Sequence, residues 1–183
     1  MSDSEVNSAK QLLPGVWHLS LQRQADMRGS FVKTYAASAF AAHGLSFTAA
    51  EEYYSVSARN VVRGMHFQLP PHDHAKMVYC AVGSVHDVLL DLRRGAGYGA
   101  VADLILDAAS PSALLIPPGV AHGFRSLEDG SLMVYKTTTE YAPTADTGIR
   151  WDSFGHNWNL DGETILSDRD RRHIGFDAFT SPF

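Results

Sequence analysis

The sequence has little of what several protein classes require. Its 183 residues include one cysteine, Cys80, so an intramolecular disulfide cannot form, and the apolar run around it indicates a small buried side chain. No stretch approaches the roughly 20 apolar residues of a membrane span, and the polar residues 1–10 hold no apolar signal region. Acidic residues outnumber basic ones, 20 to 15, which leaves no basic excess for nucleic acid. We therefore expect a cytoplasmic protein that binds neither a membrane nor nucleic acid.

What the sequence does contain is a series of short apolar or alternating runs separated by glycine, proline and other turn residues. Its apolar content of 45% is sufficient for a buried core, and its length fits one domain over residues 1–183, with a flexible end at residues 1–10. Runs of this spacing predict an all-β sandwich or barrel. The expected strands are Val16–Leu21, Ser30–Thr34, Ala50–Ser57, Val61–Gln68, Ala75–Ala81, Val85–Leu92, Val101–Leu106, Ala113–Ile116, Gly123–Ser126 and Leu132–Thr138. Ala36–His43 and Leu166–His173 are expected to be short helices, the second with Ser167 as its N-cap.

One of these runs, Val85–Leu92, carries acidic residues in a strand pattern. Alternation places Asp87 and Asp91 on one face, and a mostly apolar set on the other. Such a strand fits the wall of a barrel beside a polar interior. An ordinary surface face is an equally good interpretation of this strand taken alone.

Histidines gather in the β-rich stretch between residues 66 and 122, and imidazole is the commonest metal ligand in proteins. Pro117–His122 has the form P-x-G-x-x-H, which resembles the second sequence motif of metal-binding cupins. The first cupin motif requires H-x-H followed by a glutamate. His72 and His74 supply the H-x-H, but residues 75–82 contain no glutamate. The ligand set is incomplete, and we predict no metal site.

A second group of polar side chains lies between residues 63 and 76. In a strand, His66 and Gln68 point to the same face, with Phe67 on the opposite one. A neutral histidine is a suitable general base near pH 7, and Arg63 and Lys76 are cations that suit a diphosphate or an enolate. On spacing alone, a hydrogen-bonded structural His66 is the simpler interpretation, and Arg63 serves equally well to brace a turn.

Seven ordered segments carry a family resemblance that extends from about Gly15 to Arg171. They are Asp26–Phe31, Val62–Gln68, Asp87–Arg94, Pro117–Phe124, Tyr135–Thr138, Gly148–Asp152 and Leu166–Asp170. With these segments the chain resembles the deoxythymidine-diphosphate (dTDP)-4-dehydrorhamnose 3,5-epimerase family. Seven motifs in this order and at consistent spacing make the resemblance specific.

The resemblance implies a double-stranded β-helix, which is a cupin or jelly-roll barrel, with a few short helices. Members of the family bind a nucleotide-diphospho-4-keto-6-deoxyhexose in the mouth of the barrel. They use neither a metal nor a redox cofactor, so no cofactor is expected. They form homodimers by exchanging strands between barrels, which makes a second copy of the chain the expected protein partner. The resemblance thus implies a cofactor-independent carbohydrate epimerase of deoxysugar biosynthesis.

Residue roles follow from the resemblance, motif by motif. His66 matches the catalytic base of the family, Asp170 matches the acid that orients this base, and Tyr135 matches the proton donor on the opposite face of the sugar. The positions that match substrate contacts are Arg28, Phe31, Lys33, Glu51, Tyr53, Arg63, Gln68, Lys76, His122 and Tyr141. Without the resemblance, Tyr135 would be interpreted as a core residue that ends an apolar run, and Asp170 as part of a solvated helix face.

The implied reaction explains why these groups are needed. A C4 ketone acidifies the protons on C3 and C5, and removing one gives an enolate whose charge lies largely on O4. His66 is expected to remove that proton, and Tyr135 to return a proton to the other face, which inverts the carbon. Lys76 would stabilise the enolate, and Asp170 would hold the imidazole tautomer and favour the imidazolium.

Three positions depart from the family pattern. Lys33 stands where the family commonly has a glutamate that accepts a hydrogen bond from the thymine ring, and a lysine cannot accept one. Glu51 and Tyr53 replace a glutamine and an asparagine that contact the substrate. Two hypotheses follow: either the base is not thymine, with the N3 and O2 acceptors of cytosine suited to Lys33, or the sugar differs or is inverted at one carbon only.

The sequence is also compatible with three other functions. A metal-dependent cupin enzyme would bind a stoichiometric metal. A non-catalytic sugar-nucleotide-binding protein would bind without exchanging protons, and the intact set of His66, Tyr135 and Asp170 weighs against it. A ketoisomerase that moves a carbonyl between C3 and C4 shares the enolate, so the sequence discriminates poorly against it.

Overall fold

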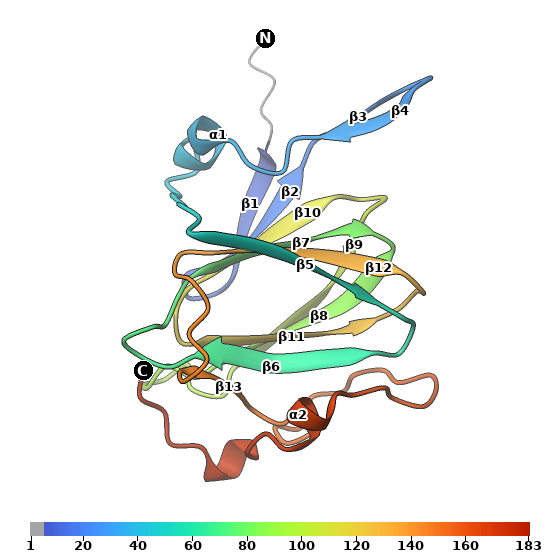
Figure 1. The fold of residues 1–183 in the computed structure, drawn as a ribbon. Coiled ribbons are helices and arrows are strands. Elements are labelled where there is room, and N and C mark those ends of the chain that lie inside the picture. The colour runs from blue at the N-terminus through green and yellow to red at the C-terminus, as the bar shows by residue number, and fades with distance from the viewer. Residues whose placement is uncertain (1–5) are drawn as a thin grey trace.

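The computed structural model describes residues 6–183, in which two antiparallel sheets face each other (Figure 1). In spatial order, the six-stranded sheet consists of β1 (Val6–Leu13), β2 (Val16–Leu21), β10 (Ser112–Ile116), β7 (Lys76–Val82), β12 (Ser131–Thr137) and β5 (Glu51–Ser57). The five-stranded sheet consists of β13 (Asp146–Gly148), β6 (Val62–Gln68), β11 (Val120–Ser126), β8 (Ser84–Asp91) and β9 (Val101–Asp107).

The remaining elements are short. A separate hairpin is made of β3 (Arg23–Asp26) and β4 (Gly29–Val32). The helices are α1 (Ala37–Ala41), α2 (Asp168–Arg171) and the 3₁₀ helix η1 (Phe176–Ala178). Two facing antiparallel sheets with only short helices confirm the predicted all-β, cupin-like fold.

Three apolar clusters hold these layers together. One lies between the sheets, where Leu89 of β8 and Phe124 of β11 meet Leu114 of β10 and Met133 of β12. A second cluster packs side chains from residues 149–183 on the outer face of the five-stranded sheet, and a third packs residues 32–47 on the outer face of the six-stranded sheet. Both sheets are therefore packed on their inner faces and over part of their outer faces, and apolar burial is the main term that stabilises the arrangement.

β8 is buried along its whole length, which decides between the two interpretations of Val85–Leu92. Leu89 faces the cluster between the sheets, whereas Val88 and Leu90 face the outer cluster. Asp87 is fully buried. The surface-face interpretation is therefore wrong, and the strand is a wall of the barrel with an acidic group inside.

The predicted strands overlap β2 and β4 to β12, and Val16–Leu21 matches β2. The sequence interpretation missed β1, β3 and β13, and the flexible end expected over residues 1–10 is wrong for residues 6–10. These residues belong to β1 and pair with β2, while residues 1–5 lie outside the described part of the chain. Ser167 caps α2 as predicted, because its Oγ accepts a hydrogen bond from the Asp170 backbone N–H at 3.0 Å. Within residues 6–183, no helix is long and apolar enough to cross a membrane.

β6 and β11 approach each other closely beside the polar interior. Gly64 of β6 has a φ of 143°, and a Cβ atom at this position would lie 2.5 Å from the Gly123 Cα. Only glycine fits both this backbone conformation and this space. The pairing of the two strands places His122 opposite His66 and shifts register between His122 and Phe124. The close approach therefore holds the backbones that carry the two interior histidines.

Candidate active site

A cavity of about 330 Å³ lies between the two sheets, a volume in the range of small-molecule sites. The five-stranded sheet contributes His66 from β6 and His122 from β11. The six-stranded sheet contributes Lys76 from β7 and Tyr135 from β12. The two walls of the cavity therefore present different titratable groups to one ligand space.

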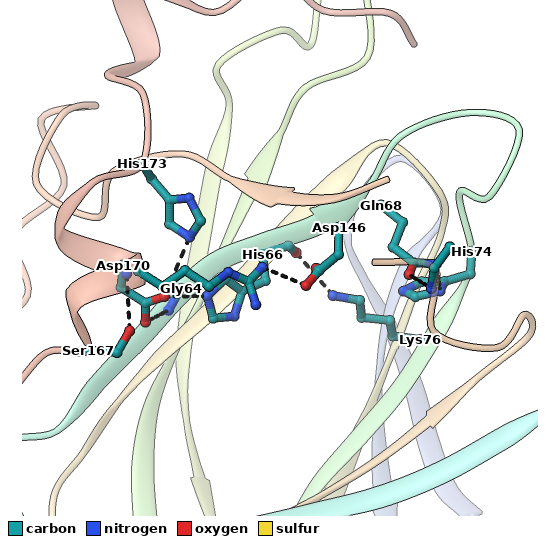
Figure 2. Close-up of polar contacts among 11 residues, drawn as sticks. Gly64, His66, Gln68, His74, Lys76, Asp146, Ser167, Asp170 and His173 are labelled. Atoms are coloured by element: carbon teal, nitrogen blue, oxygen red, sulfur yellow. Dashed lines mark hydrogen bonds and ion pairs between the residues drawn. The ribbon is translucent and has the colours of Figure 1, made fainter. Parts of the chain in front are cut away.

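His66 is held by a carboxylate from a distant part of the chain. Strand alternation turns His66 into the cavity and packs the Phe67 ring in the outer cluster. The His66 Nε2 lies 2.8 Å from Asp170 Oδ1, and His173 Nε2 lies 3.4 Å from the same oxygen, so that Asp170 contacts both rings (Figure 2). The Gly64 backbone N–H donates to Asp170 Oδ2 at 3.4 Å. Asp170 is only 4% exposed, so its interpretation as part of a solvated helix face is wrong.

Burial and this ion pair set the protonation of the two groups. Burial lowers the pKa of His66, and the hydrogen bond and charge of Asp170 oppose that shift. Burial alone raises the pKa of Asp170, but hydrogen bonds from His173 and His66 outweigh it and hold that pKa well below its usual range. Near pH 7 the pair is a neutral imidazole beside a carboxylate. This is the state of a general base with its orienting partner.

Tyr135 lies on the opposite wall. Its ring stacks on Tyr53, with centroids 4.9 Å apart and an interplanar angle of 13°. Its hydroxyl lies 3.2 Å from Ser55 Oγ. Burial raises the pKa of Tyr135 above its ordinary value, so the phenol is protonated at neutral pH and able to donate a proton. Tyr135 belongs to the core cluster between the sheets and also lines the cavity, so the core interpretation was incomplete.

Lys76 and His122 are two further titratable groups that line the cavity. Lys76 is buried, and its Nζ donates to the His66 carbonyl oxygen at 3.0 Å. Burial lowers the pKa of Lys76 to about 8, so the ammonium form remains the major one at neutral pH. His122 Nε2 lies 2.7 Å from Asp87 Oδ2, and burial raises the pKa of Asp87. Lys76 is therefore a cation next to the base, where it can stabilise negative charge that develops on a ligand.

Arg63 and Gln68 line the cavity and are also anchored by protein groups. Arg63 Nε donates to Ser57 Oγ at 3.0 Å. Gln68 Nε2 donates to the His72 carbonyl oxygen at 2.8 Å, and its Oε1 accepts from the Ala142 N–H at 2.6 Å. Arg63 thus braces β5 and still lines the ligand space, while Gln68 lines the cavity and holds the segments of His72 and Ala142 together.

Known proteins share this sequence and this fold. Residues 10–178 match the family model described as dTDP-4-dehydrorhamnose 3,5-epimerase. The dTDP-4-dehydrorhamnose 3,5-epimerase of Mycolicibacterium smegmatis is 35% identical over 89% of this chain and 83% of its own. The chain belongs to this family. It is therefore an isomerase of the epimerase class.

A second sequence relative and a solved structure are also similar to this chain. The dTDP-4-dehydrorhamnose 3-epimerase of Streptomyces niveus is 36% identical over 87% of this chain and 78% of its own. The crystal structure of dTDP-6-deoxy-D-glucose-3,5-epimerase RmlC from Legionella pneumophila, in complex with dTDP-4-keto-L-rhamnose, aligns with a TM-score of 0.89. It is 25% identical to this chain, and the alignment covers 94% of both.

Two of the positions that depart from the family pattern lie in the cavity. Glu51 Oε2 accepts a hydrogen bond from the Tyr141 backbone N–H at 2.6 Å, and both residues line the cavity. Tyr53 lies on the same face of β5 as Glu51, and burial raises its pKa to about 12. Glu51 thus contacts the Tyr141 segment, whereas Tyr53 lies against the Tyr135 ring.

Three of the predicted substrate contacts lie away from this cavity. Arg28 and Phe31 belong to the β3–β4 hairpin, which projects from the barrel, and Lys33 follows β4 (Figure 1). The Arg28 side chain is 87% exposed, and its Nη2 lies 2.5 Å from Asp26 Oδ2. Phe31 is 60% exposed. Within one chain, the structure does not bring these three side chains to the residues of the epimerase cavity.

Sequence interpretation missed several residues whose side chains line the cavity, namely Ser55, His74, Phe124, Thr137, Asp146 and Arg169. Ser55 and Thr137 lie two positions from Tyr53 and Tyr135, so strand alternation was a sufficient signal for both. Asp146 and Arg169 form an ion pair with a separation of 2.6 Å. They were missed because β13 was not predicted and because the choice within the Arg169-Asp170 segment fell on the acid alone.

The histidines of the two cupin-like motifs have separate partners. His74 Nδ1 lies 3.1 Å from Gln68 Nε2 and 3.1 Å from Thr139 Oγ1, whereas His122 pairs with Asp87. Burial lowers the pKa of His74 to about 4. Across residues 6–183, the groups spaced closely enough for a metal ion are His66 with Asp170 and His173, and His86 with Asp103 and His156.

Proposed function

We propose that this epimerase inverts C3, C5 or both in a dTDP-linked 4-keto-6-deoxyhexose, with His66 as the base and Tyr135 as the acid. The observation that carries the proposal is that the two groups come from opposite sheets and line one cavity. Inversion requires a proton to leave one face of a carbon and another to arrive on the opposite face. The ligand bound to the Legionella relative, dTDP-4-keto-L-rhamnose, supports the substrate class.

In the proposed mechanism, His66 takes the proton from the carbon next to the C4 ketone and becomes an imidazolium beside the Asp170 carboxylate. The electron pair of the broken C–H bond forms the enolate, whose negative charge lies on O4. The buried Lys76 ammonium stabilises that charge without rearranging. Tyr135 then donates its hydroxyl proton to the opposite face, and the C–H bond re-forms with inverted configuration. Solvent takes the extra proton from the His66 imidazolium and returns one to the Tyr135 phenolate.

Relatives of this chain are named for inverting different numbers of carbons. The Mycolicibacterium relative is named a 3,5-epimerase and the Streptomyces relative a 3-epimerase, and both are similar to this chain to the same degree. Both single and double inversion are therefore compatible with family membership. Stacking on Tyr53 holds the Tyr135 ring in a single position. An acid held in one position suits protonation of one carbon, which supports inversion at one carbon as the second candidate activity.

We also propose a cytoplasmic homodimer in which each chain lends its β3–β4 hairpin to the cavity of the other. The hairpin extends beyond its own barrel and carries an Arg28 guanidinium, a 60% exposed Phe31 and a fully exposed Met27. A cation and an aromatic ring suit a nucleoside diphosphate, because the first pairs with phosphate and the second stacks on a base. Partner exchange of this hairpin would explain why the family-matched residues lie outside the cavity of their own chain.

Proton exchange at C3 and C5 tests the activity directly. The protein is incubated in heavy water with dTDP-4-keto-6-deoxyglucose, and the C3 and C5 proton signals are followed by NMR. Loss of both signals indicates a 3,5-epimerase, and loss of one indicates a single-carbon epimerase. In either case His66→Ala should abolish the exchange. Retention of both signals by the wild-type protein would rule out this substrate, and the cytidine-diphosphate analogue would then be tested in the same way.

A further inference from the structure

A second cluster of metal-ligand side chains lies outside the epimerase cavity, on the outer face of the five-stranded sheet. It brings together His86 of β8, Asp103 of β9 and His156 of the segment after β13. One ligand atom from each of the three residues lies within 4.8 Å of the others. The His86 Nε2 to Asp103 Oδ2 distance is 2.7 Å. Two imidazoles and one carboxylate are a ligand set that suits a borderline divalent cation such as zinc.

An unpartnered imidazole nitrogen is the second observation at this place. The His156 Nε2 is buried and has no hydrogen-bond partner in the part of the chain that the structure describes. Burying a polar atom without a partner destabilises a fold, so this nitrogen is a candidate for a ligand outside the chain. A metal bound between the three side chains would satisfy this nitrogen with a bond that the protein alone does not supply.

Packing holds the His156 ring in place for such a role. The ring is stacked on Phe154 at a centroid distance of 6.1 Å and contacts Trp158 edge-on at 5.3 Å. The His86 ring lies 5.4 Å from the His156 ring. Because both imidazoles are already oriented by packing, little conformational freedom remains to be lost when a metal binds.

The charges around the cluster are compatible with a cation. Arg125 of β11 is the register partner of His86, but its Nη1 lies 3.3 Å from Asp161 Oδ1, which neutralises its charge. The Asp103 side chain is 48% exposed, whereas His86 is 4% exposed. A shallow hollow lined by His86, Asp103 and Arg125 opens beside them. A hydrated ion can thus reach the carboxylate first and then the two imidazoles.

We propose that His86, Asp103 and His156 form a structural zinc site, with water as the fourth ligand. The site would fasten the segment around residue 156 to β8 and β9. That segment supplies Trp158 to the outer core and leads on to α2, which carries Asp170. The ion would therefore stabilise the C-terminal region that presents the partner of His66, without entering the reaction. This site is independent of the proposed function.

Zinc binding to the full chain tests the proposal. Protein stripped with a chelator is titrated with zinc sulfate by calorimetry, and thermal unfolding is followed with and without zinc. The wild-type protein should bind zinc and, with zinc at about 100 times its dissociation constant, should unfold roughly 5–10 °C higher. His156→Ala and Asp103→Asn should weaken this binding roughly 100-fold or more and remove the shift. His72→Ala, which changes an exposed histidine elsewhere, should leave both unchanged.

Further experiments distinguish the proposed site from the other group that could hold a metal ion, His66 with Asp170 and His173. His173→Ala alters the group around Asp170 and should leave one zinc equivalent and the thermal shift in place. Cobalt substitution adds a spectroscopic signature, because a tetrahedral site of this kind gives visible d–d absorption that Asp103→Asn should change. Absence of zinc binding to the wild-type protein, or binding that neither His156→Ala nor Asp103→Asn weakens, would overturn the proposal. Asp103 is half-exposed, so its variant is expected to fold.

Discussion

Tyr53 and Tyr135 are direct cross-strand partners whose rings stack inside the cavity. β5 and β12 pair them in register, and the ring centroids lie 4.9 Å apart at an angle of 13°. A stacked aromatic pair contributes about 0.5–1.5 kcal/mol beyond the burial of its surface. From the sequence resemblance, we expect an asparagine at this position in other members of the family. The ring of the proposed proton donor is therefore restrained by a side chain that the family pattern lacks.

Removing this restraint should impair proton donation more than substrate binding. We expect Tyr53→Ala to lower kcat on the order of 10- to 100-fold, because a misplaced acid loses its alignment with the carbon it protonates. The Michaelis constant should change less. Steady-state kinetics with dTDP-4-keto-6-deoxyglucose give both constants, and deuterium incorporation shows whether the ratio of exchange at C3 and C5 changes.

The neighbouring tyrosine provides a matched control for this experiment. Tyr54 lies on the other face of β5 and is 68% exposed, so Tyr54→Ala should keep near-normal kinetics. Tyr53→Phe preserves the stack and should stay close to the wild-type protein. Equal losses in Tyr53→Ala and Tyr54→Ala would show that damage to β5, rather than the stacked ring, is responsible.

Asp170 is expected to act through His66, and its amide variant should reveal this in the pH profile. Asp170→Asn should lower kcat roughly 100-fold or more, because the imidazole loses the partner that holds its tautomer and stabilises its charged form. The carboxylate opposes the burial that lowers the pKa of His66. Without it, that pKa should fall further, and the acidic limb of kcat/KM against pH should move to lower pH.

A neighbouring acid separates this effect from a general effect on α2. Asp168 lies in the same first turn of α2 but is exposed, so Asp168→Asn removes an equal charge without touching His66. Its pH profile should overlay that of the wild-type protein. An Asp170→Asn profile with an unmoved acidic limb would contradict the assigned role, even if activity were low.

The fold was largely predictable because strand alternation and turn residues are local signals. Val16–Leu21 follows both and was predicted with the bounds of β2. β1 was missed because its buried residues are few and its pattern is mostly polar. β13 spans only Asp146–Gly148, and it exists because it pairs with β6, a long-range contact that leaves no periodic pattern. Elements created by pairing rather than by periodicity were the ones that sequence interpretation missed.

Site residues that belong to a sequence motif were predictable. Contacts that only the tertiary structure creates were not. His66, Tyr135 and Asp170 were named from motifs, yet nothing local indicated that Asp170 is buried against His66. That contact needs the chain to return to β6 after 104 residues. The proximity of Asp146 to Arg169 is likewise a product of the tertiary structure. Residue identity came from the sequence, while burial, pairing and the opposition of the two walls came from the fold.

Lys76 should set the alkaline limit of catalysis. Its ammonium form is required to stabilise the enolate, and its pKa is about 8, so kcat should fall as the pH rises through about 8. Lys76→Arg keeps the charge at all accessible pH values and should move this limb upward. Lys76→Met should lower kcat roughly 100-fold or more. Lys136→Met, which removes a lysine paired with Glu52 instead, should retain the limb of the wild-type protein.

The proposed exchange of hairpins predicts that two inactive variants rescue each other. His66→Ala destroys the cavity of its own chain, whereas Arg28→Ala would weaken the cavity of the partner. A mixed dimer then has one cavity with an intact His66 and an intact Arg28 from the other chain. After dissociation and reassociation of equal amounts, half of the dimers are mixed and each has one complete site. The mixture should therefore regain about a quarter of the wild-type activity.

A second mixture shows whether the rescue has this cause. His66→Ala and Tyr135→Ala both damage the cavity of their own chain, so their mixed dimers contain no complete site and should stay inactive. If Arg28 served its own chain, the first mixture would stay as inactive as the second. Native mass spectrometry of each mixture, which resolves the mass difference between the variants, confirms that mixed dimers form. Rescue confined to the Arg28 pair would therefore locate Arg28 in the partner's cavity, 87% exposed in its own chain but in contact with the substrate of the other.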